Sequence, residues 1–378
     1  MTDADFMQLA LRLARRGSGT TSPNPMVGAV LVQGGRILGQ GWHRRAGEPH
    51  AEIEALREAQ RRGHSTKGAT LFVTLEPCCT HGRTPPCTQA IIAAGIHRVV
   101  VGTKDPNPNH AGKGFTLLKR AGITVGSLPE FDGPCSQLNE AFNHWIVHRT
   151  PFVTVKAAMT LDGKIATARG ESKWITGEKA RDHGMKLRRG SDAILVGINT
   201  VLADNPSLTA RTSSSHKTTA RLRRIILDSQ ARTPMTAKVV ADDFAALTTV
   251  VISAQAPKAR VAALSKRVRV FVAPATRDGS LSIPWLLKKL GAENVTSLLV
   301  EGGGEVNASF LLGGFAQRIA FFYAPKILGG RDALRAVAGE GVTDLRDSLQ
   351  LREVEWKRLG EDWLLSARVK PPGRRRKH

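Results

Sequence analysis

The sequence predicts an α/β protein that is divided into two domains. Its 378 residues exceed what one average domain needs, since domains usually contain about 100–200 residues. Apolar, β-branched runs alternate with helical patterns along most of the chain, which favours sheets covered by helices on both faces. The alternation is interrupted near residue 147, and Pro151 precedes a new strand. We therefore expect domains at 1–147 and 148–370, followed by a basic tail at 371–378.

The expected elements follow from hydrophobic periodicity and from glycine and proline signals. In the first domain, a helix at 6–15 precedes a hairpin with strands at 26–32 and 36–42. Helices then follow at 50–63, 85–95, 112–122 and 137–148, and strands at 70–75, 97–103 and 123–128. In the second domain we expect helices at 178–190 and 284–291, and strands at 152–159, 193–200, 223–229, 248–254, 268–274, 295–300 and 321–328. The polar stretch 212–219 is typical of a surface loop.

Composition argues against membrane and secreted proteins. No segment approaches the roughly 18 consecutive apolar residues of a membrane helix, and acidic residues precede basic ones at the N-terminus, unlike a secretory signal. Cys78, Cys79 and Cys87 fall within ten residues, which is poor spacing for disulfides and suits metal ligands in a reducing compartment. We expect a cytoplasmic protein without membrane contacts.

His50, Cys78 and Cys87 form a candidate metal site. His50 opens a helix, Cys78 follows a strand, and Cys87 begins another helix after two prolines. Catalytic zinc commonly takes three protein ligands of these types and leaves its fourth position to water. A purely structural zinc site is the alternative, since Cys79 and His81 could supply a fourth protein ligand.

Glu52 is the candidate proton carrier of this site. It lies two residues after His50, so it can reach a zinc-bound water without binding the metal. A His-x-Glu pair followed by cysteines is the pattern of zinc deaminases, whose glutamate moves protons to the departing amine. Eight residues separate Cys78 from Cys87, however, where the generic motif has two. A His-x-Glu pair alone is more typical of an exposed helix face.

The segment TLEPCCTHGRTPPC resembles the zinc-binding segment of the bifunctional deaminase/reductase family of riboflavin biosynthesis, which has this wider cysteine spacing. Co-linear motifs extend the resemblance over nearly the whole chain. They are Ser22–Pro25, Val27–Gly28, Asp105–Pro108 and Gly112–Gly114 in the first half, and Leu161–Lys164, Gly170–Ser172, Trp174–Thr176, Thr200–Pro206 and Glu301–Gly304 in the second.

The resemblance implies a cytidine-deaminase-like three-layer α/β/α domain and a dihydrofolate-reductase-like α/β domain. The first would use Zn²⁺ to deaminate a diamino-pyrimidinone ribosylamine 5′-phosphate, which is a small phosphorylated pyrimidine. The second would use NADPH to reduce the ribosyl group to a ribityl chain. We also expect a homo-oligomer that forms through the reductase domain.

By motif, the resemblance assigns substrate contacts in the first domain to Asn24, His43, Asp105, Asn107 and Lys113. An asparagine presents both a donor and an acceptor to a pyrimidine edge, and a lysine suits a phosphate. Asn24 and Asn107 lie beside prolines, however, where an asparagine also caps turns.

The chain departs from the family pattern after the first zinc cysteine. The family usually reads Pro-Cys-Ser-His, whereas this chain reads Pro77-Cys78-Cys79-Thr80-His81. The substrate contact of the family's histidine could pass to the Thr80 hydroxyl or to His81. Cys79 is more typical of a small packing residue than of a ligand.

In the second domain, Gly302, Gly303 and Gly304 connect a strand to a helix, so their backbone could approach a pyrophosphate. A plain turn is the alternative. Lys156 lies inside an apolar strand and is a candidate acid near the ribose C1′, because burying an unpaired lysine is costly. It could instead extend to solvent from the strand end.

The resemblance assigns the remaining contacts of the second domain by motif. Those expected at the substrate are Ser172, Arg188, Asp204, Leu208, Arg211 and Glu301. Those expected at NADPH are Trp174, Thr200, Asp204, Ser229 and Gly302–Gly304. The guanidinium forks of Arg188 and Arg211 suit a phosphate. Two alternatives remain: Arg188, within KLRRG, is also typical of a solvated helix end, and Trp174 is also typical of the core.

The strongly basic balance leaves two rival classes, a nucleic-acid base deaminase and a noncatalytic zinc-stabilised RNA-binding module. The formal net charge is +23, which suits nucleic acid and phosphorylated small molecules equally well. Part of this charge lies in the tail PPGRRRKH, which is typical of a disordered end. Aromatic residues make up only 5% of the chain, although single-stranded nucleic acid needs stacking platforms. Neither rival explains the second domain, so we expect no specific nucleic-acid partner.

Overall fold

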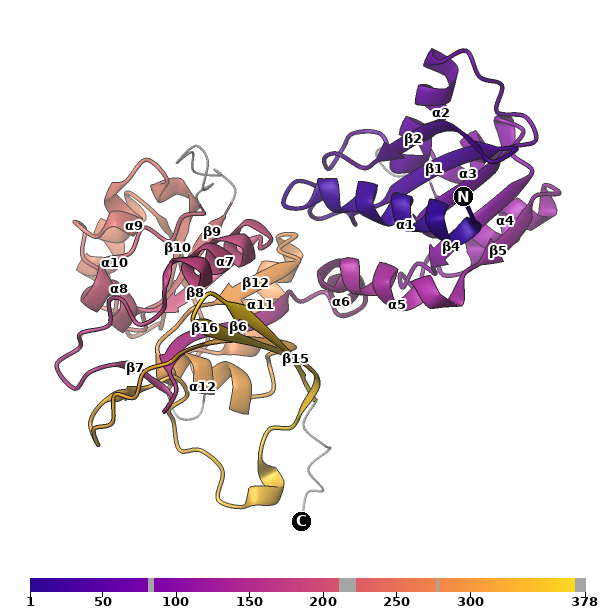
Figure 1. Cartoon of the computed structure of the whole chain (residues 1–378). Helices are drawn as coiled ribbons and strands as arrows, with labels where there is room; N and C mark the ends of the chain where they lie inside the picture. The colour runs from indigo at the N-terminus through magenta and orange to yellow at the C-terminus, as the bar shows by residue number, and fades with distance from the viewer. Residues whose placement is uncertain (81–84, 211–221, 277–278, 371–378) are drawn as a thin grey trace. The chain divides into compact units, whose positions relative to one another are not determined.

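The chain, shown as a computed structural model, forms two compact units, Met1–Arg149 and Thr150–His378 (Figure 1). The structure describes residues 1–80, 85–210, 222–276 and 279–370. Outside these ranges lie His81, Arg211, the whole loop expected at 212–219 and the basic tail at 371–378. Each unit has its own sheet and its own core.

The first unit is built on a five-stranded mixed sheet with the order β2-β1-β3-β4-β5. β1 pairs antiparallel with β2 and β3, whereas β3, β4 and β5 are parallel. The strands are β1 (Gly28–Gln33), β2 (Arg36–Trp42), β3 (Thr70–Leu75), β4 (Arg98–Thr103) and β5 (Thr124–Ser127), and the helices are α1 (Asp3–Ala14), α2 (Ala51–Arg61), α3 (Cys87–Ala93), α4 (Lys113–Arg120), α5 (Pro129–Leu138) and α6 (Glu140–His148).

Helices cover both faces of this sheet, because successive side chains of a strand point to opposite faces. Leu71 of β3 is buried in one cluster with Ala55 of α2 and Ile91 of α3. Its neighbour Phe72 is buried on the other face, where its ring lies 5.3 Å from that of Phe6 of α1. The three-layer α/β/α arrangement is therefore confirmed.

The contact between α2 and β2 determines where His50 lies. A β-carbon at Gly41 would come within 2.6 Å of the carbonyl oxygen of Ala51, which no side chain tolerates. The glycine thus lets the first turn of the helix lie directly on the strand. His50 is the N-cap residue of this helix and has an extended backbone. It therefore lies just before the first turn of the helix, at the end of the sheet.

The second unit has a nine-stranded sheet with the order β11-β10-β9-β8-β12-β6-β13-β16-β15 and a small sheet of β14 and β7. Neighbours from β11 to β13 are parallel, and β16 and β15 complete the sheet in antiparallel pairs. The strands are β6 (Phe152–Thr160), β7 (Lys164–Ala166), β8 (Ala193–Gly197), β9 (Arg223–Leu227), β10 (Thr248–Ile252), β11 (Arg269–Val272), β12 (Ser297–Val300), β13 (Arg318–Ala324), β14 (Leu334–Arg335), β15 (Leu351–Leu359) and β16 (Asp362–Val369). The helices are α7 (Glu178–Arg189), α8 (Ile198–Asp204), α9 (Lys238–Ala241), α10 (Lys258–Ser265), α11 (Ile283–Ala292) and α12 (Gly304–Leu312).

Helices pack on both faces of this sheet too. Leu195 of β8 belongs to one buried cluster with Leu290 of α11 and Phe310 of α12, whereas its neighbour Val196 belongs to another with Val240 and Leu264. In the described part of the chain, no helix has the length and apolarity needed to cross a membrane.

Several expected boundaries are wrong, and the structure gives the reasons. The strand expected at 193–200 ends at Gly197, and the next three residues form the first turn of α8. The helix expected at 137–148 is two helices that meet at Asn139, whose side chain binds the backbone N and O of Met26. The strand expected at 321–328 begins three residues earlier, at Arg318, and ends at Ala324, before Pro325. The hairpin of β15 and β16 was not expected, because β15 is exposed and rich in charged residues.

Candidate active sites

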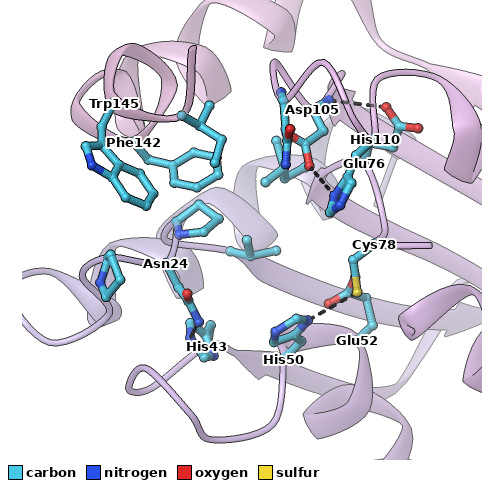
Figure 2. A pocket seen from close by; sticks show the side chains of 16 residues that line it. Asn24, His43, His50, Glu52, Glu76, Cys78, Asp105, His110, Phe142 and Trp145 are labelled. Atoms are coloured by element: carbon cyan, nitrogen blue, oxygen red, sulfur yellow. Dashed lines mark hydrogen bonds and ion pairs between the residues drawn. The ribbon is translucent and has the colours of Figure 1, made fainter. Parts of the chain in front are cut away.

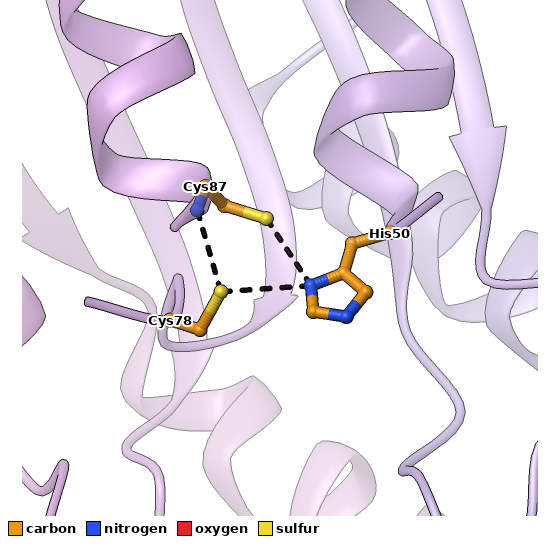
Figure 3. A group of neighbouring side chains, drawn as sticks. All are labelled: His50, Cys78 and Cys87. Atoms are coloured by element: carbon orange, nitrogen blue, oxygen red, sulfur yellow. Dashed lines mark hydrogen bonds between the residues drawn. The ribbon is translucent and has the colours of Figure 1, made fainter. Parts of the chain in front are cut away.

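Three zinc-type ligands meet at one end of the first sheet. His50 precedes α2, Cys78 follows β3, and Cys87 is the first residue of α3 (Figure 3). Nδ1 of His50 lies 3.2 Å from Sγ of Cys87 and 3.5 Å from Sγ of Cys78. Tetrahedral zinc with bonds of about 2.0–2.3 Å holds its ligand atoms roughly 3.5 Å apart, so these atoms fit the ion.

The cluster has three members among the residues that the structure describes, with ligand atoms within 4.8 Å of one another. Cys79 is half-buried and does not belong to it. Three protein ligands are the number that leaves one position of a tetrahedral ion for water, as in catalytic zinc sites.

The two cysteines are electrostatically unequal. Hydrogen bonding from Cys87 and then from His50 lowers the pKa of Cys78 to about 4, although burial opposes this. The same pairing with Cys78, together with burial and the nearby Glu52, raises the pKa of Cys87. The Cys78 hydrogen bond also raises the pKa of His50. Cys78 is thus held as a thiolate, which is the form that binds zinc.

Glu52 lies beside these ligands in a cavity of about 320 Å³ (Figure 2). It is the second residue of α2, and only 3% of it is exposed. Burial, and then the charge of Cys78, raises the pKa of its carboxyl. A carboxyl group with a raised pKa can both accept and donate a proton near neutral pH, as a proton carrier must.

Four of the five predicted substrate residues of the first domain line the same cavity, namely Asn24, His43, Asp105 and Asn107. Nδ1 of His43 lies 3.1 Å from the carbonyl oxygen of Pro49 and therefore carries the proton. Its Nε2 then accepts from the Asn24 amide at 3.2 Å, which orients the amide oxygen. Lys113, the fifth, is exposed at the start of α4 and is not part of the cavity wall.

Sequence reasoning missed Glu76, which organises one wall of the cavity. Its buried carboxylate accepts hydrogen bonds from the backbone N–H groups of Asp105, Gly112, Gly114 and Phe115, at 3.0 to 3.4 Å. Four amides on one carboxylate hold the loop after β4 against the end of β3. An acidic residue at the end of a buried strand, directly before Pro77 and Cys78, was the signal that could have found it.

Sequence reasoning also missed an apolar wall of the cavity and His110. Phe142, Trp145 and Ile146 lie at helical spacing on α6 and face the cavity, opposite Asp105 and His110 (Figure 2). The apolar positions of this helix were predicted only as a helical pattern. In the structure they give the cavity a flat aromatic side suited to a planar ring.

The second site lies along the carboxyl edge of the parallel strands in the second unit. Ser229 follows β9, Thr200 follows β8, and Gly302–Gly304 follow β12. These strands are adjacent in the sheet, which places the predicted cofactor residues along one edge. Ligands of α/β sheets characteristically bind at this edge.

Lys156, Arg188 and Glu301 form a half-buried charge cluster in this site. The Arg188 fork donates to both Glu301 oxygens at 2.9 and 2.8 Å, and Lys156 Nζ lies 3.6 Å from the same carboxylate. Burial opposes ionisation, but the charges of Arg188 and Lys156 lower the pKa of Glu301 to about 2. All three line a cavity of about 640 Å³. Lys156 thus has a partner and points to the cavity, and the Arg188 fork is occupied by Glu301.

The other predicted residues of the second domain differ in burial and in their partners. Ser172 donates to Asp204 at 3.1 Å, and Lys173 also pairs with Asp204. Trp174 lines the cavity but is 67% exposed, so it is not a core residue. Leu208 is 2% exposed and packs in the core, so its side chain is not at the cavity surface.

The three glycines are not equivalent. A β-carbon at Gly302 would collide with Val306, and one at Gly304 with the carbonyl oxygen of Arg335. Gly303, the N-cap residue of α12, has no heavy atom within 4 Å of such a carbon. Packing therefore requires glycine at 302 and 304, and Gly303 presents open backbone at a helix N-terminus.

Comparison with known proteins matches both units. Residues 1–103 match the cytidine and deoxycytidylate deaminase zinc-binding region, and residues 151–365 match the RibD C-terminal domain. The riboflavin biosynthesis protein RibD of Aquifex aeolicus is 44% identical over 96% of this chain and 97% of its own length. That of Actinobacillus pleuropneumoniae is 42% identical over 98% of this chain and 96% of its own.

Solved structures agree along the whole chain. Acinetobacter baumannii RibD has a TM-score of 0.85 at 35% identity and covers 97% of this chain and 99% of that chain. A diaminohydroxyphosphoribosylaminopyrimidine deaminase/5-amino-6-(5-phosphoribosylamino)uracil reductase from Thermotoga maritima has a TM-score of 0.82 at 35% identity, with the same coverage. These matches confirm the predicted fold class of both domains. The chain therefore belongs to the RibD family of bifunctional riboflavin-biosynthesis enzymes, with a zinc-binding deaminase domain and an NADPH-dependent reductase domain.

Proposed function

We propose that His50, Cys78 and Cys87 hold the zinc ion and that Glu52 moves the protons of the deamination. The substrate is the diamino-pyrimidinone ribosylamine 5′-phosphate. The observation that carries the assignment is the buried Glu52 carboxyl, which lines one cavity together with His50 and Cys78 of the ligand cluster. Bound zinc lowers the pKa of a coordinated water and so supplies the nucleophile at neutral pH.

The remaining groups of the first cavity bind and orient the pyrimidine. The Asn24 amide, fixed by His43, faces the polar edge of the ring, and Asp105 and Asn107 lie on the loop held by Glu76. Phe142 and Trp145 pack on the face of the ring and exclude water. Glu52 takes the proton released by the nucleophile and donates it to the departing amine.

In the second domain, we propose that Lys156 donates a proton to the ring oxygen of the ribose, which opens it at C1′. NADPH, when bound, supplies the hydride for that carbon. Glu301 pairs with the lysine and holds Arg188 at the cavity wall. The backbone of Gly303 binds the cofactor phosphates and ribose together with Thr200 and Ser229, which follow strands of the same sheet edge.

The deaminase assignment is tested by Glu52→Gln, with ammonia release as the measurement. We expect release to fall by about a hundredfold to ten-thousandfold, the usual contribution of a general acid-base group, with zinc content unchanged. Glu54→Gln is the matched control, since Glu54 lies on the same helix but pairs with Arg44 and Arg57. Full activity in Glu52→Gln would refute the proton-carrier role.

We also propose a homo-oligomer that forms through the reductase domain, with β15 as part of the contact. This strand is the last in the order of the nine-stranded sheet, and Trp356 on it is 56% exposed. Edge strands are frequent sites of strand pairing between chains. Sedimentation should show a dimer that Trp356→Lys dissociates, and a monomeric wild type would contradict the proposal.

A cytoplasmic location is the last part of the proposal. The four cysteines are free in the structure, and three of them lie at or beside the zinc cluster, where oxidation would block metal binding. Cell fractionation should recover the enzyme with cytoplasmic markers, whereas recovery with an exported fraction would contradict this location.

A further inference from the structure

An imidazole that no motif predicted lies in the deaminase cavity. His110 belongs to the loop between β4 and α4, and its ring faces the cavity beside Asp105 (Figure 2). Both ring nitrogens have partners. Nδ1 lies 3.4 Å from Oδ2 of Asp105, and Nε2 lies 2.9 Å from Oγ1 of Thr80.

The loop holds this ring in place by several backbone contacts. Asp105 uses its other oxygen to accept from the N–H of Asn107 at 2.8 Å, which fixes the carboxylate. The carbonyl of His110 accepts from the N–H of Lys113 at 2.7 Å, and the Glu76 carboxylate binds amides on both sides of His110. An imidazole with a carboxylate on one nitrogen and a hydroxyl on the other has a defined orientation, as binding residues require.

Thr80 stands where the family motif has histidine, and this is the chain's departure from the pattern described above. The Thr80 hydroxyl is hydrogen-bonded to the ring of His110, and that ring lines the cavity, so the side chain at position 80 lies directly beside the imidazole. A histidine at position 80 would compete with the His110 ring for space. The chain therefore supplies its imidazole from the opposite loop.

The pair lies toward the solvent end of the cavity. Glu52, at the zinc, is 3% exposed, whereas the His110 side chain is 23% exposed and Thr80 is an exposed residue. Lys113 lies near Cys79, which is the neighbour of Thr80. Burial raises the pKa of the Cys79 thiol, and the positive charge of Lys113 partly offsets this effect. The reacting ring must reach the zinc, so the ribose 5′-phosphate extends toward this end.

We propose that His110 and Thr80 bind the 5′-phosphate side of the deaminase substrate, with Asp105 as the residue that positions the imidazole. The proposal rests on the deaminase function given above. Nε2 of His110 is hydrogen-bonded to the exposed Thr80 hydroxyl, so the two form one polar pair near the exposed Lys113, which adds positive charge. In this chain His110 takes over the substrate contact of the motif histidine, and we assign that contact to the phosphate side.

The test compares the phosphorylated substrate with the same compound without its phosphate, using the full-length, zinc-loaded enzyme. For His110→Ala we expect KM for the phosphorylated substrate to rise about tenfold or more, the loss typical of a charge-assisted hydrogen bond. Its kcat and its KM for the dephosphorylated compound should change less than about threefold. The variant removes a contact to the phosphate that is equal in the ground state and the transition state, and such a loss raises KM without lowering kcat. His97→Ala, an exposed histidine of the same domain, is the matched control.

A swap variant makes the test specific. Thr80→His combined with His110→Ala should recover most of the phosphate preference, because it returns the imidazole to the motif position. His110→Gln serves as a second variant if His110→Ala loses zinc. An unchanged KM, or an equal loss on both compounds, would overturn the phosphate role. Failure of the deaminase function itself would appear differently, as no ammonia release by the wild-type enzyme from either compound.

Discussion

The two cavities use their charged groups in different ways. In the deaminase cavity, Cys78 pairs with the His50 imidazole and the buried Glu52 carboxyl lines the same cavity, and this set of ligand atoms and carboxyl suits a cation. In the reductase cavity, Glu301 is paired with both Arg188 and Lys156, so one of the two positive charges is balanced within the protein. The first site therefore needs its metal to be electrostatically complete, and the second is complete apart from its one excess positive charge, which suits an anionic phosphate.

Removal of one zinc ligand should give the largest effect and separate the two sites. Cys78→Ser should lose the metal and nearly all ammonia release, because a neutral hydroxyl replaces the thiolate that the structure stabilises. Reduction of the deaminated intermediate, supplied directly, should stay within about twofold, since the second cavity is lined by residues of its own unit. Metal analysis and the two assays measure this.

The control for that variant is Cys79→Ser, which also tests the structural-zinc alternative. Cys79 lies outside the ligand cluster, so its replacement should leave the zinc content unchanged. Loss of zinc in Cys79→Ser would show that the site has a fourth protein ligand and would contradict the catalytic assignment.

Breaking the charge cluster of the second cavity should have an intermediate effect. Glu301→Gln leaves the half-buried Arg188 and Lys156 without their partner and should destabilise the reductase domain by about 1–3 kcal/mol, less than the cost for a fully buried pair. The folded pKa of Glu301 is about 2, below an unfolded value near 4.3, so its contribution is present above pH about 4.3 and is lost as pH falls toward 2. Urea unfolding at pH 7 and pH 3 should show a larger acid loss for wild type than for Glu301→Gln; equal stability of the two proteins at pH 7 would show that the cluster is unimportant.

The glycine turn should give the smallest effect on folding. Gly303→Ala should change the free energy of unfolding by less than about 0.5 kcal/mol, because its β-carbon enters open space, yet it should raise KM for NADPH. Gly304→Ala should instead cost about 1–3 kcal/mol, because its β-carbon overlaps the Arg335 carbonyl. An unchanged KM for NADPH in Gly303→Ala would remove this turn from the cofactor site.

The same contrast explains how far the sequence alone could reach. Zinc ligands and their glutamate lie within short motifs at the ends of regular elements, so spacing was sufficient to predict the cluster of His50, Cys78 and Cys87. Periodicity likewise predicted the first sheet and the parallel strands of the second, because these strands are mostly buried and apolar. The pairing of Lys156 with Glu301 depends on β6 lying beside β12, which no local pattern specifies.

Residues that act through distant backbone were the hardest to foresee. Glu76 binds amides 29 to 39 positions away, and His110 meets Thr80 across 30 positions. The exposed strand β15 lacks an apolar face, and the break at Asn139 depends on Met26, which is 113 positions away. In each case the determining contact is long-range, so local propensity could not reveal it.

The central claim is that each domain carries one complete reaction. The most direct test assays Glu52→Gln and Lys156→Ala for both steps, with ammonia release from the diamino substrate and NADPH consumption with the deaminated intermediate. The account predicts that Glu52→Gln loses only ammonia release and that Lys156→Ala loses only NADPH consumption. Loss of both reactions in either variant, with zinc and fold retained, would contradict it.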